Sequence, residues 1–578
     1  MAKVFLQNAF KGFTLDQDKV LPPEETVRRF RERLKAVDLD ILERTVRIDN
    51  GRLDIPVYFS VCGRDARKII GTKKQMGKGG TPEQAEASAV MELAERFSLF
   101  SFFKNRENFF VDTYEKVADR AVPFEVIARS VHGTSEDLNN ARQVFSRLPL
   151  QWTQATNLTR HEEVLIPFNW FFAINEFNGP SAGNCTEEAL SQGICEVVER
   201  HVSSLVSRSK MKTPAIRLDS VTDPVVVDML GKYRKNGVRL FASDFSLDTG
   251  IPSVGVLAYD PATFPDTSEI VWTAGTTPNP QKALSRALTE VAQLSGDFNS
   301  SSNYVASGLP KLKSIDEADF VMYPDEQVDI AALPDLSSDN IRVEVEGCIA
   351  ALARLGLDVL VVDVTHPRLQ IPAYYTIIPG AHFRERAAGT SVGMFSAKLI
   401  TETRDPRRAF AELRHMDALL PGKYYIQFYL GSCSLKLGDP AAATAFFQQA
   451  LVLEPNREDR ASIYSYLGQA LKARGQYSQA LDVLEQALAC DTERTDVHNL
   501  MGFCYFKLKE YRKAIQCFQE VLRLDPTSAI DYANIAANYR DLGETQLAVA
   551  YYEHALHLDP SIDFAREALR DLQAAETQ

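Results

Sequence analysis

The sequence predicts a mixed α/β (α+β) domain followed by an all-α repeat array. Residues 1–410 alternate β-rich runs, such as "VRLFAS" and "LDVLVVDV", with helical stretches, a pattern that is typical of a domain built from both strands and helices. From about residue 421 onward the strands stop and a 34-residue period begins. We therefore expect two domains, one over residues 1–410 and one over residues 422–578.

The composition limits the partners that this chain can have. Its 578 residues are 45% hydrophobic, which is enough apolar material for several buried cores. The 64 Lys and Arg residues are outnumbered by 77 Asp and Glu residues and form no basic block, so a nucleic acid is not an expected partner. The sequence contains neither a signal peptide nor an apolar run of the roughly 18 residues that cross a membrane, so we expect a cytoplasmic protein without a membrane partner.

The first helix with chemical interest is expected to begin at Thr81. Thr81 as N-cap, Pro82 at the first position and Gln84 three residues after the cap form a capping box. The preceding stretch "GTKKQMGKGG" is not a Walker A loop, because its spacing is one residue too long and a Gly follows Lys78. Its glycines permit either a tight turn into the helix or a backbone-lined anion site at the helix N-terminus.

Three expected helices carry carboxylates at matched spacing. Glu92 and Glu95 in "ASAVMELAERF" recur 104 residues later as Glu196 and Glu199 in "LSQGICEVVERHV", and "KALSRALTEVAQL" supplies Glu290. Residues three and four apart lie on one face of a helix, so the members of each pair project together. One such pair alone is usually a solvated helix face. Two copies in register with a third related helix, all among apolar or small residues, favour a shared internal site instead.

This donor set indicates a magnesium-bound nucleotide. Clustered carboxylates repel one another unless cations lie between them. Oxygen ligands without paired His or Cys suit Mg²⁺, which keeps several waters and takes phosphate oxygens for the rest of its shell. The Arg, Gln and Ser residues beside the carboxylates are side chains that suit a nucleotide.

No residue pattern predicts a nucleophile or a general base. The eight cysteines include no CxxC pair and no nearby His cluster, which argues against a zinc site and a disulfide framework. His201 follows Arg200, but a lone His is most often a core or surface residue. Cys185 and Cys195 have no His placed in sequence to activate them. We therefore assign no catalytic residue.

The C-terminal region is a repeat array. Gly468 and Gly502 lie 34 residues apart, and Ala536 lies 34 residues further on. This period, with two helices in each unit, resembles the tetratricopeptide repeat. We expect four helix pairs over about 422–560 and a capping helix in "SIDFAREALRDLQAA". Such an array holds a peptide or a partner protein on its concave face, or it stabilises the first domain or makes a dimer, and the sequence leaves these alternatives open.

Three segments together resemble the signature segments of the YcaO family. They are "MGKGGTPEQAEASAVMELAERFS", "NGPSAGNCTEEALSQGICEVVERHV" and "AGTTPNPQKALSRALTEVAQ", and the resemblance spans roughly residues 1–400. The "GKG" and "SAGN" stretches and the helical C-terminal extension are most similar to enterobacterial members. Near the N-terminus, "DKVLPPEETVRRF" resembles the segment with which those members contact the nucleotide.

The resemblance implies that ATP and Mg²⁺ bind without a P-loop. It implies Mg²⁺-facing carboxylates at five positions, namely Glu92, Glu95, Glu196, Glu199 and Glu290. It implies nucleotide contacts at ten further positions, namely Lys19, Thr26, Lys78, Ser88, Arg96, Asn184, Gln192, Arg200, Arg286 and Gln293. Some positions keep a second interpretation, because Arg96 and Arg200 also suit salt bridges between helices, and Lys78 and Thr26 also suit a solvated surface.

Members of the family activate a peptide amide. A thiol, a hydroxyl or external sulfide adds to the backbone carbonyl, ATP phosphorylates the resulting oxygen, and loss of phosphate leaves an azoline or a thioamide. The resemblance implies that this chain is a cyclodehydratase or thioamide synthetase of this type. Its substrate would be a peptide or protein, the repeats would recruit that substrate or a partner protein, and a homodimer is consistent with the family.

Two departures from the family bear on the product. The chain ends in "DLQAAETQ" instead of a proline-rich tail, and no leader-peptide-binding domain is evident ahead of the first signature segment. We therefore favour a thioamide or another amide modification over an azole. An accessory role in ribosomal-protein methylthiolation and a nucleotide-regulated scaffold without catalysis are the alternatives, and the retention of all five Glu residues favours catalysis over the scaffold.

Overall fold

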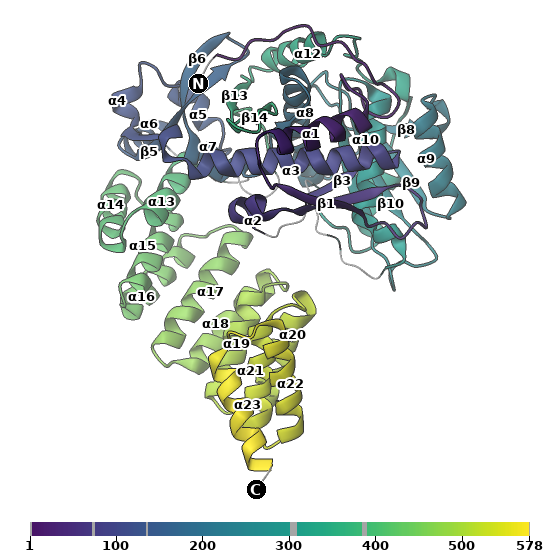
Figure 1. The fold of residues 1–578 in the computed structure, drawn as a ribbon. Helices are drawn as coiled ribbons and strands as arrows, with labels where there is room; N and C mark the ends of the chain where they lie inside the picture. Colours follow the sequence, from purple (N-terminus) through teal and green to yellow (C-terminus); the bar gives the residue numbers. More distant parts are fainter. Residues whose placement is uncertain are drawn as a thin grey trace. The chain divides into compact units, whose positions relative to one another are not determined.

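The computed structural model describes residues 3–71, 75–133, 137–300, 304, 309–383 and 390–576. The chain divides into two compact units, one formed by residues 1–135 and 146–391 and the other by residues 136–145 and 392–578 (Figure 1). Strands and helices mix in the first unit, whereas the described residues of the second unit form helices, so the predicted fold class is confirmed. Residues 72–74 of the glycine-rich stretch lie outside the described residues.

Three separate sheets make up the first unit. Its described strands are β1 (Leu42–Arg47), β2 (Val57–Cys62), β3 (Gln75–Lys78), β4 (Phe110–Thr113), β5 (Pro149–Asn157), β6 (Glu162–Pro167), β7 (Pro180–Ala182), β8 (Ala215–Arg217), β9 (Arg239–Asp244), β10 (Ser253–Tyr259), β11 (Val271–Thr276), β12 (Gln327–Asp329), β13 (Leu360–Asp363) and β14 (Ala373–Ile377). The three sheets have the strand orders β1-β2-β3, β11-β10-β9-β8-β12 and β4-β5-β13-β14-β7, with β6 paired to β5. Every pair is antiparallel except β8 with β12.

Three long helices connect these sheets. They are α3 (Pro82–Lys104), α8 (Thr186–Ser209) and α10 (Pro280–Ser295), which follow β3, β7 and β11 along the chain. Each helix packs on the sheet of its preceding strand and on a second sheet, since α3 also contacts β7 and β14, α8 also contacts β11, and α10 also contacts β3 (Figure 1). This cyclic packing brings the carboxylate-bearing faces of the three helices toward one another.

Local sequence fixes where these helices begin. At the start of α3, the Thr81 side chain accepts a hydrogen bond from the backbone N–H of Gln84 at 3.3 Å, so the predicted N-cap is confirmed. At the start of α10, the Asn279 side chain accepts from the backbone N–H groups of Gln281 and Lys282. Caps of this kind set the first turn of a helix and therefore the phase of every later side chain.

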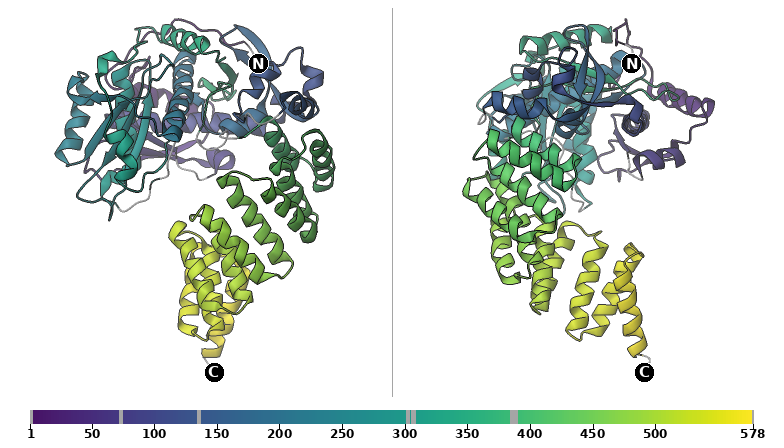
Figure 2. Two further views of the ribbon diagram at one scale, coloured as in Figure 1. Left: turned by 180° about the vertical axis from the view of Figure 1, so that it is seen from behind. Right: turned by 90° about the vertical axis from the view of Figure 1, so that its left-hand side faces the viewer.

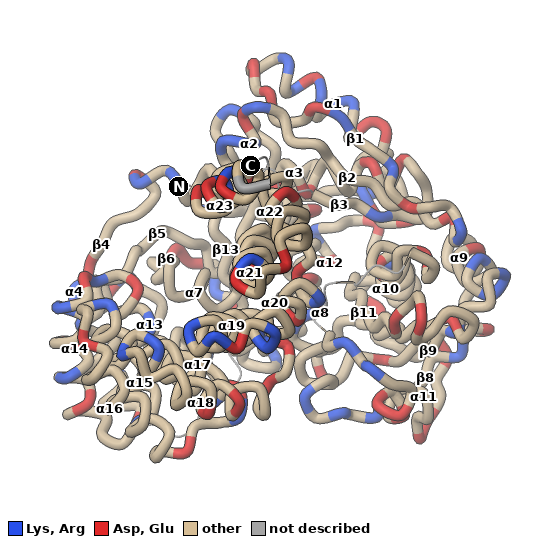
Figure 3. The backbone as a smooth tube through the Cα atoms, turned by 90° about the horizontal axis from the view of Figure 1, so that it is seen from below, with Lys and Arg blue, Asp and Glu red and all other residues tan. Residues whose placement is uncertain are grey.

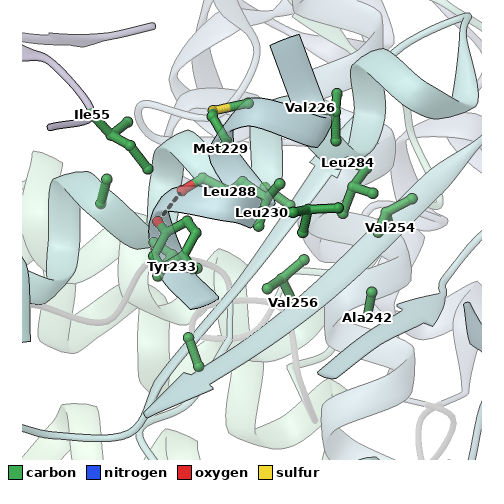
Figure 4. Close-up of a cluster of buried hydrophobic side chains, with 14 of the residues drawn as sticks. Ile55, Val226, Met229, Leu230, Tyr233, Ala242, Val254, Val256, Leu284 and Leu288 are labelled. Carbon is green, nitrogen blue, oxygen red and sulfur yellow. Dashed lines mark hydrogen bonds between the residues drawn. The ribbon is translucent and has the colours of Figure 1, made fainter. Parts of the chain in front are cut away.

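An apolar cluster holds α10 against the five-stranded sheet (Figure 4). Helix α9 (Pro224–Lys235) contributes Val226 and Tyr233, β10 contributes Val254, and α10 contributes Leu284 and Leu288. The Tyr233 hydroxyl donates to the backbone carbonyl of Leu288 at 2.7 Å, which satisfies the one polar atom of this buried ring. The other helices of this unit are α1 (Pro23–Ala36), α2 (Arg64–Ile70), α4 (Tyr114–Val117), α5 (Phe124–Ala128), α7 (Phe168–Asn175), α11 (Asp319–Met322) and α12 (Ile341–Arg354).

Strand β3 approaches α3 so closely that Gly77 has no room for a side chain. A Cβ at Gly77 would lie 2.0 Å from the backbone N of Ala89 and 2.4 Å from the backbone O of Ala85. Strand β11 meets α10 in the same way, because a Cβ at Gly275 would lie 2.3 Å from the backbone O of Ala283. Glycine at these strand positions lets the backbones of strand and helix come together.

Gly77→Ala is expected to lower the free energy of unfolding by about 1–3 kcal/mol, because the backbone of β3 or α3 must shift to admit the methyl group. Gly231→Ala in α9 is the matched control, since a Cβ there meets no atom within 4 Å. In a helix that change stabilises by about 0.5–1 kcal/mol. Urea unfolding measures both values, and a Gly77→Ala variant as stable as the wild type would contradict the close approach.

Helix pairs make up the second unit (Figure 2). Its helices are α6 (Leu138–Ser146), α13 (Val392–Thr403), α14 (Pro406–Leu419), α15 (Tyr424–Lys436), α16 (Pro440–Val452), α17 (Arg457–Ala473), α18 (Tyr477–Cys490), α19 (Thr495–Lys507), α20 (Tyr511–Leu524), α21 (Ala529–Asp541), α22 (Thr545–Leu558) and α23 (Asp563–Glu576). The four expected pairs are α15 with α16 through α21 with α22, and α23 follows as the expected capping helix. Helices α13 and α14 pack on α15, so this unit begins ahead of residue 422.

Charged residues of both signs are interspersed along the chain (Figure 3). The tube alternates between Lys or Arg and Asp or Glu segments in both units, and no long tract carries one sign. Among the helices of the described residues, none is long and apolar enough to pass through a bilayer.

Candidate active site

A cavity of about 280 Å³ lies between α3, α8 and α10. The N-terminal segment and β3 complete its wall. Of the fifteen site residues that the sequence singled out, fourteen line this cavity, namely Lys19, Thr26, Lys78, Ser88, Glu92, Glu95, Arg96, Asn184, Gln192, Glu196, Arg200, Arg286, Glu290 and Gln293. The remaining residue, Glu199, does not line it. The three motifs therefore meet in one interior space.

Helix α3 presents two carboxylates and one guanidinium to the cavity. Arg96 Nε lies 3.4 Å from Glu95 Oε1 and 4.0 Å from Glu92 Oε1, so Arg96 pairs within its own helix. Burial raises the pKa of Glu92 and raises the pKa of Glu95 well above its usual value, although Arg96 opposes both shifts. The central guanidinium carbon of Arg96, Cζ, also lies 5.2 Å from the ring centre of Phe177, which is within the range of a cation–π interaction.

Helix α8 repeats this arrangement with one difference. Arg200 lies 3.9 Å from Glu196 and 3.4 Å from Glu199, and burial raises the pKa of Glu196. Glu199 is only 2% exposed and accepts hydrogen bonds from Arg286 Nε at 2.9 Å and from the backbone N–H of Thr276 at 3.3 Å. Burial alone would raise the pKa of Glu199, but Arg286 and Arg200 outweigh it and the pKa is lowered. Glu199 therefore stays ionised and holds Arg286 in place through this hydrogen-bonded ion pair.

Helix α10 and β3 supply the cations of the opposite wall. Arg286 reaches Gln192, whose amide oxygen accepts from Arg286 Nη1 at 2.9 Å in the orientation that satisfies both groups. Lys78 Nζ contacts the carboxylate of Glu290, so β3 and α10 are joined by an ion pair across the cavity. Burial, with help from the charge of Arg286, lowers the pKa of Lys78 to about 7.

An N-terminal segment closes the cavity through residues that the sequence analysis missed. Asp16 is 1% exposed, and its carboxylate accepts from the backbone N–H of Gly80 at 2.6 Å and from the Ser285 hydroxyl at 2.9 Å. This carboxylate thereby joins the start of α3 to α10 and places Lys19 in the cavity wall. The only signal in the sequence was the position of Asp16 in "LDQDK", beside the predicted Lys19.

A second missed carboxylate, Glu188, lies at the start of α8. It is 4% exposed and accepts from the Asn184 side chain at 3.0 Å and from the backbone N–H of Val20 at 3.2 Å. Lys19 Nζ lies 3.8 Å from the same side chain. Glu188 thus orients two of the predicted nucleotide-contacting residues, and Thr26, whose hydroxyl donates to Pro22 O at 3.2 Å, lies on the neighbouring α1.

The donor set fits a divalent cation that carries phosphate groups. Several buried polar atoms in the cavity wall have no hydrogen-bond partner, namely Glu95 Oε1, Arg96 Nη1 and Arg200 Nε. Within the described residues, no three His, Cys, Asp or Glu side chains are gathered closely enough to hold a metal by themselves. Arg and Lys side chains lie between the carboxylates instead. Carboxylates are hard ligands for Mg²⁺, and guanidinium groups bind phosphate oxygens, so both halves of the ligand have matching donors here.

One thiol and two imidazole groups near α8 have pKa values that leave them unreactive as a nucleophile or a base at neutral pH. Burial raises the pKa of Cys185 to about 11, so its thiol is protonated at neutral pH. His201 is 8% exposed, and its Nδ1 accepts from the backbone N–H of His382 at 3.0 Å. Burial lowers the pKa of both His201 and His382 to about 4. Both imidazoles are therefore neutral at physiological pH.

His201 is expected to make the stability of the chain depend on pH between about 6.5 and 4. A buried His with a lowered pKa stabilises the fold above its ordinary pKa, and this contribution is lost as the pH falls toward about 4. A shift of this size corresponds to about 3 kcal/mol. The nearby titratable groups are His132 and His382, which oppose protonation of His201 when they are protonated, and Asp248, which favours it.

His201→Gln keeps a hydrogen-bond acceptor and removes the titration. When the free energy of unfolding, measured with urea, is plotted against pH, the curves of wild type and variant should differ in slope only between pH values of about 6.5 and 4. The difference between wild type and variant cancels the opposite trend of the buried glutamates, whose raised pKa values destabilise the fold as the pH rises. Parallel stability curves for the two proteins would contradict a neutral buried imidazole.

Residues 76–382, just over half of the chain, match the family model described as "YcaO cyclodehydratase, ATP- and Mg²⁺-binding". Residues 424–493, 495–528 and 532–562 match tetratricopeptide repeat models. The first match covers β3, α3, α8 and α10, which carry most of the cavity wall. The second group covers the helix pairs of the other unit.

Two relatives and one solved structure extend these matches. An uncharacterized protein of Methanothermobacter thermautotrophicus is 28% identical over 379 residues, which cover 62% of this chain and 93% of that protein. The Escherichia coli protein named ribosomal protein S12 methylthiotransferase accessory factor YcaO is 27% identical over 294 residues, which cover 47% of this chain and 48% of that protein. The structure of YcaO from Methanopyrus kandleri bound with AMPPCP and Mg²⁺ has the same fold, with a TM-score of 0.50 at 23% identity over 64% of this chain and 94% of that one.

Proposed function

This chain belongs to the YcaO family, whose members bind ATP and Mg²⁺, and we propose that it activates a backbone amide of a peptide or protein by phosphorylating the amide oxygen. The product would be a thioamide or an azoline, and the repeats would recruit the substrate or a partner protein. The observation that carries this proposal is that carboxylates, guanidinium groups and Lys78 line one shared cavity.

The proposed reaction balances with ATP as co-substrate. A sulfur or oxygen nucleophile forms a bond to the amide carbon, and the carbonyl oxygen takes the terminal phosphoryl group of ATP, releasing ADP. The C–O bond then breaks and phosphate leaves with the former amide oxygen. An attacking side chain of the substrate closes an azoline ring, and its own proton and the amide N–H proton are lost as the C=N bond forms. External hydrosulfide instead leaves a thioamide, which keeps the amide N–H.

In this proposal the cavity residues position the nucleotide and neutralise the charge of its phosphate groups. The Mg²⁺ ligands would be Glu92, Glu95, Glu196 and Glu290, and the metal when bound would neutralise phosphate charge. Arg96, Arg200, Arg286 and Lys78 would hold the phosphate oxygens, which is the main demand that phosphoryl transfer makes on a protein. Lys19, Thr26, Ser88, Asn184, Gln192 and Gln293 would contact the rest of the nucleotide. Glu199 would act as a positioning residue, because it binds Arg286 at 2.9 Å.

A mass-spectrometric experiment tests this proposal. A protein extract from cells that lack this gene is incubated with the purified chain and MgATP, with and without sulfide. We expect peptides in which one sulfur replaces one backbone oxygen when sulfide is required, or peptides that lose one water when it is not. Heavy oxygen placed in the amide of an identified substrate should appear in the released phosphate. ATP hydrolysis with neither modification would overturn the proposal, and a Glu196→Gln reaction run in parallel excludes changes made by contaminants.

The name of the Escherichia coli relative favours one alternative, an accessory role in methylthiolation of a ribosomal protein. In that case the purified chain would modify no peptide alone, and deleting its gene would reduce methylthiolation of the ribosomal protein. Mass spectrometry of ribosomes from the deletion strain separates the two functions. Ribosomes that remain fully modified would exclude the accessory role.

A further inference from the structure

Four phenylalanine rings of the first unit form a contiguous patch that is partly open to solvent. Phe100 and Phe103 lie on α3, Phe172 lies on α7, and Phe177 lies in the turn between α7 and β7. In the order Phe100, Phe103, Phe172, Phe177 and back to Phe100, successive ring centres lie 5.8, 4.4, 6.0 and 5.7 Å apart. The four rings therefore close a cycle, which we call the aromatic patch.

Buried aromatic residues already fill the core beneath the aromatic patch. Phe168, which is 3% exposed, contacts both Phe103 and Phe172, and the fully buried Tyr375 contacts Phe172. Three rings of the patch itself are half-buried, and Phe177 is 37% exposed. Single exposed apolar side chains are common on soluble proteins, whereas contiguous ones more often mark a binding surface. Packing of the core therefore does not account for the patch.

The aromatic patch adjoins the nucleotide cavity through Arg96. The ring centre of Phe177 lies 5.2 Å from Arg96 Cζ, and Arg96 lines the cavity. Glu176, directly before Phe177, has a φ of 46°, a backbone conformation that residues other than glycine adopt rarely. This turn ends α7 and places Phe177 against Phe100 of α3. The patch therefore continues the cavity wall outward from Arg96.

The distance from Arg96 to the aromatic patch suits a neighbouring residue of a bound peptide. In the proposed reaction Arg96 holds phosphate oxygens of ATP, and a guanidinium binds such an oxygen at about 2.8 Å. The reacting amide would therefore lie within about 10 Å of the Phe177 ring, since Arg96 Cζ itself is 5.2 Å from it. Two or three residues of extended chain span roughly 7–11 Å. A side chain one to three residues from the reacting amide can thus reach the patch.

We propose that the aromatic patch binds a large apolar side chain of the peptide substrate, next to the amide that reacts. This inference rests on the proposed amide activation and adds a feature of the substrate that the site selects. The four rings offer faces and edges to an aromatic or aliphatic side chain, which loses its contact with water there. A peptide is the occupant that the position favours, because the substrate is the partner that must approach Arg96.

Fluorescence anisotropy of labelled peptides on the full chain tests the proposal. Three nonapeptides of Gly and Ser, with both ends blocked, carry Phe, Leu or Ala at the central position. Each is measured with and without Mg²⁺ and AMPPCP, an ATP analogue whose terminal phosphate is not transferred. We expect the Phe and Leu peptides to bind about 10-fold more tightly than the Ala peptide, because the patch buries the larger side chain. Equal affinity for the three peptides, or binding of none, would overturn the proposal.

Phe177→Ser and Phe103→Ser should each reduce the affinity for the Phe peptide to that for the Ala peptide. Phe177→Ser also removes the contact with Arg96, whereas Phe103 contacts other rings and does not line the cavity. Phe110→Ser is the matched control, because Phe110 lies on β4 and is 42% exposed, close to the 37% of Phe177. It should keep the preference for Phe over Ala. Variants of the patch that keep this preference would contradict the assigned site.

Mass spectrometry of the extract reaction separates this inference from the proposed function. Where peptides are modified, we expect large apolar residues to be enriched within three positions of the modified amide, and Phe103→Ser to lose that enrichment. Modified amides without such neighbours would overturn the inference and leave the reaction standing. A wild type that prefers the Phe peptide but modifies no peptide of the extract would contradict the proposed reaction and leave the binding site standing.

Discussion

Arg286→Met is expected to lower the free energy of unfolding by about 3–5 kcal/mol, because it leaves the charge of Glu199 buried without its main partner. Glu199 is 2% exposed and receives its shortest hydrogen bond from Arg286, while Arg200 lies further away at 3.4 Å. The variant should also lose the contact to Gln192 and with it one wall of the nucleotide cavity. Urea unfolding measures the loss of stability.

The double variant Arg286→Met with Glu199→Gln separates the ion pair from simple loss of packing. If the ion pair carries the effect, the double variant should be more stable than Arg286→Met alone, since no unpaired charge remains. Strictly additive losses in the two single variants would contradict the assigned pairing. Thr276, whose backbone N–H also binds Glu199, can still donate to the amide oxygen of the Gln side chain.

Glu196→Gln and Glu95→Gln are each expected to reduce ATP turnover by about 10²–10³-fold, because each removes a negative charge from the centre of the cavity while keeping the size of the side chain. Burial raises the pKa of both carboxylates although neighbouring Arg side chains oppose the shift, so a bound cation would favour their charged forms. Steady-state phosphate release measures the loss. Glu83→Gln in the first turn of α3 is the control, since that side chain is exposed and should leave turnover unchanged.

Glu199→Gln should behave differently from these two variants. Its side chain does not line the cavity, so it acts on the nucleotide only through Arg286. For Glu199→Gln we expect the rise in KM for ATP to be larger than the fall in kcat. Added Mg²⁺ should not restore the lost turnover. A Glu199→Gln variant whose lost turnover is restored in part by added Mg²⁺ would instead place Glu199 among the metal ligands.

Helix periodicity was enough to predict from the sequence which carboxylates share a helix face. Glu92 with Glu95 and Glu196 with Glu199 are related by a spacing that puts each pair on one helix face, so their convergence needed only three helices packed together. The same spacing does not distinguish Glu196, which faces the cavity, from Glu199, which faces Arg286. That difference is set by the packing of α8 against β11, a contact between segments remote in sequence.

The remaining parts depend on contacts that no local pattern encodes. Asp16 reaches Gly80 and Ser285, which lie 64 and 269 residues further along the chain. The three-sheet arrangement likewise follows from long-range strand pairing, as between β5 and β13. The repeat array could be predicted almost completely, because each helix pair packs on its neighbours in sequence and Gly468 or Gly502 repeats the same crossing.

The central claim is that the cavity between α3, α8 and α10 binds ATP together with Mg²⁺. Isothermal titration calorimetry of ATP into the wild type and into Glu196→Gln, each with Mg²⁺ and with a chelator, tests it most directly. We predict that the wild type binds only when Mg²⁺ is present and that the variant binds weakly or not at all. Undiminished Mg²⁺-dependent binding by Glu196→Gln, or no binding by the wild type, would contradict the account.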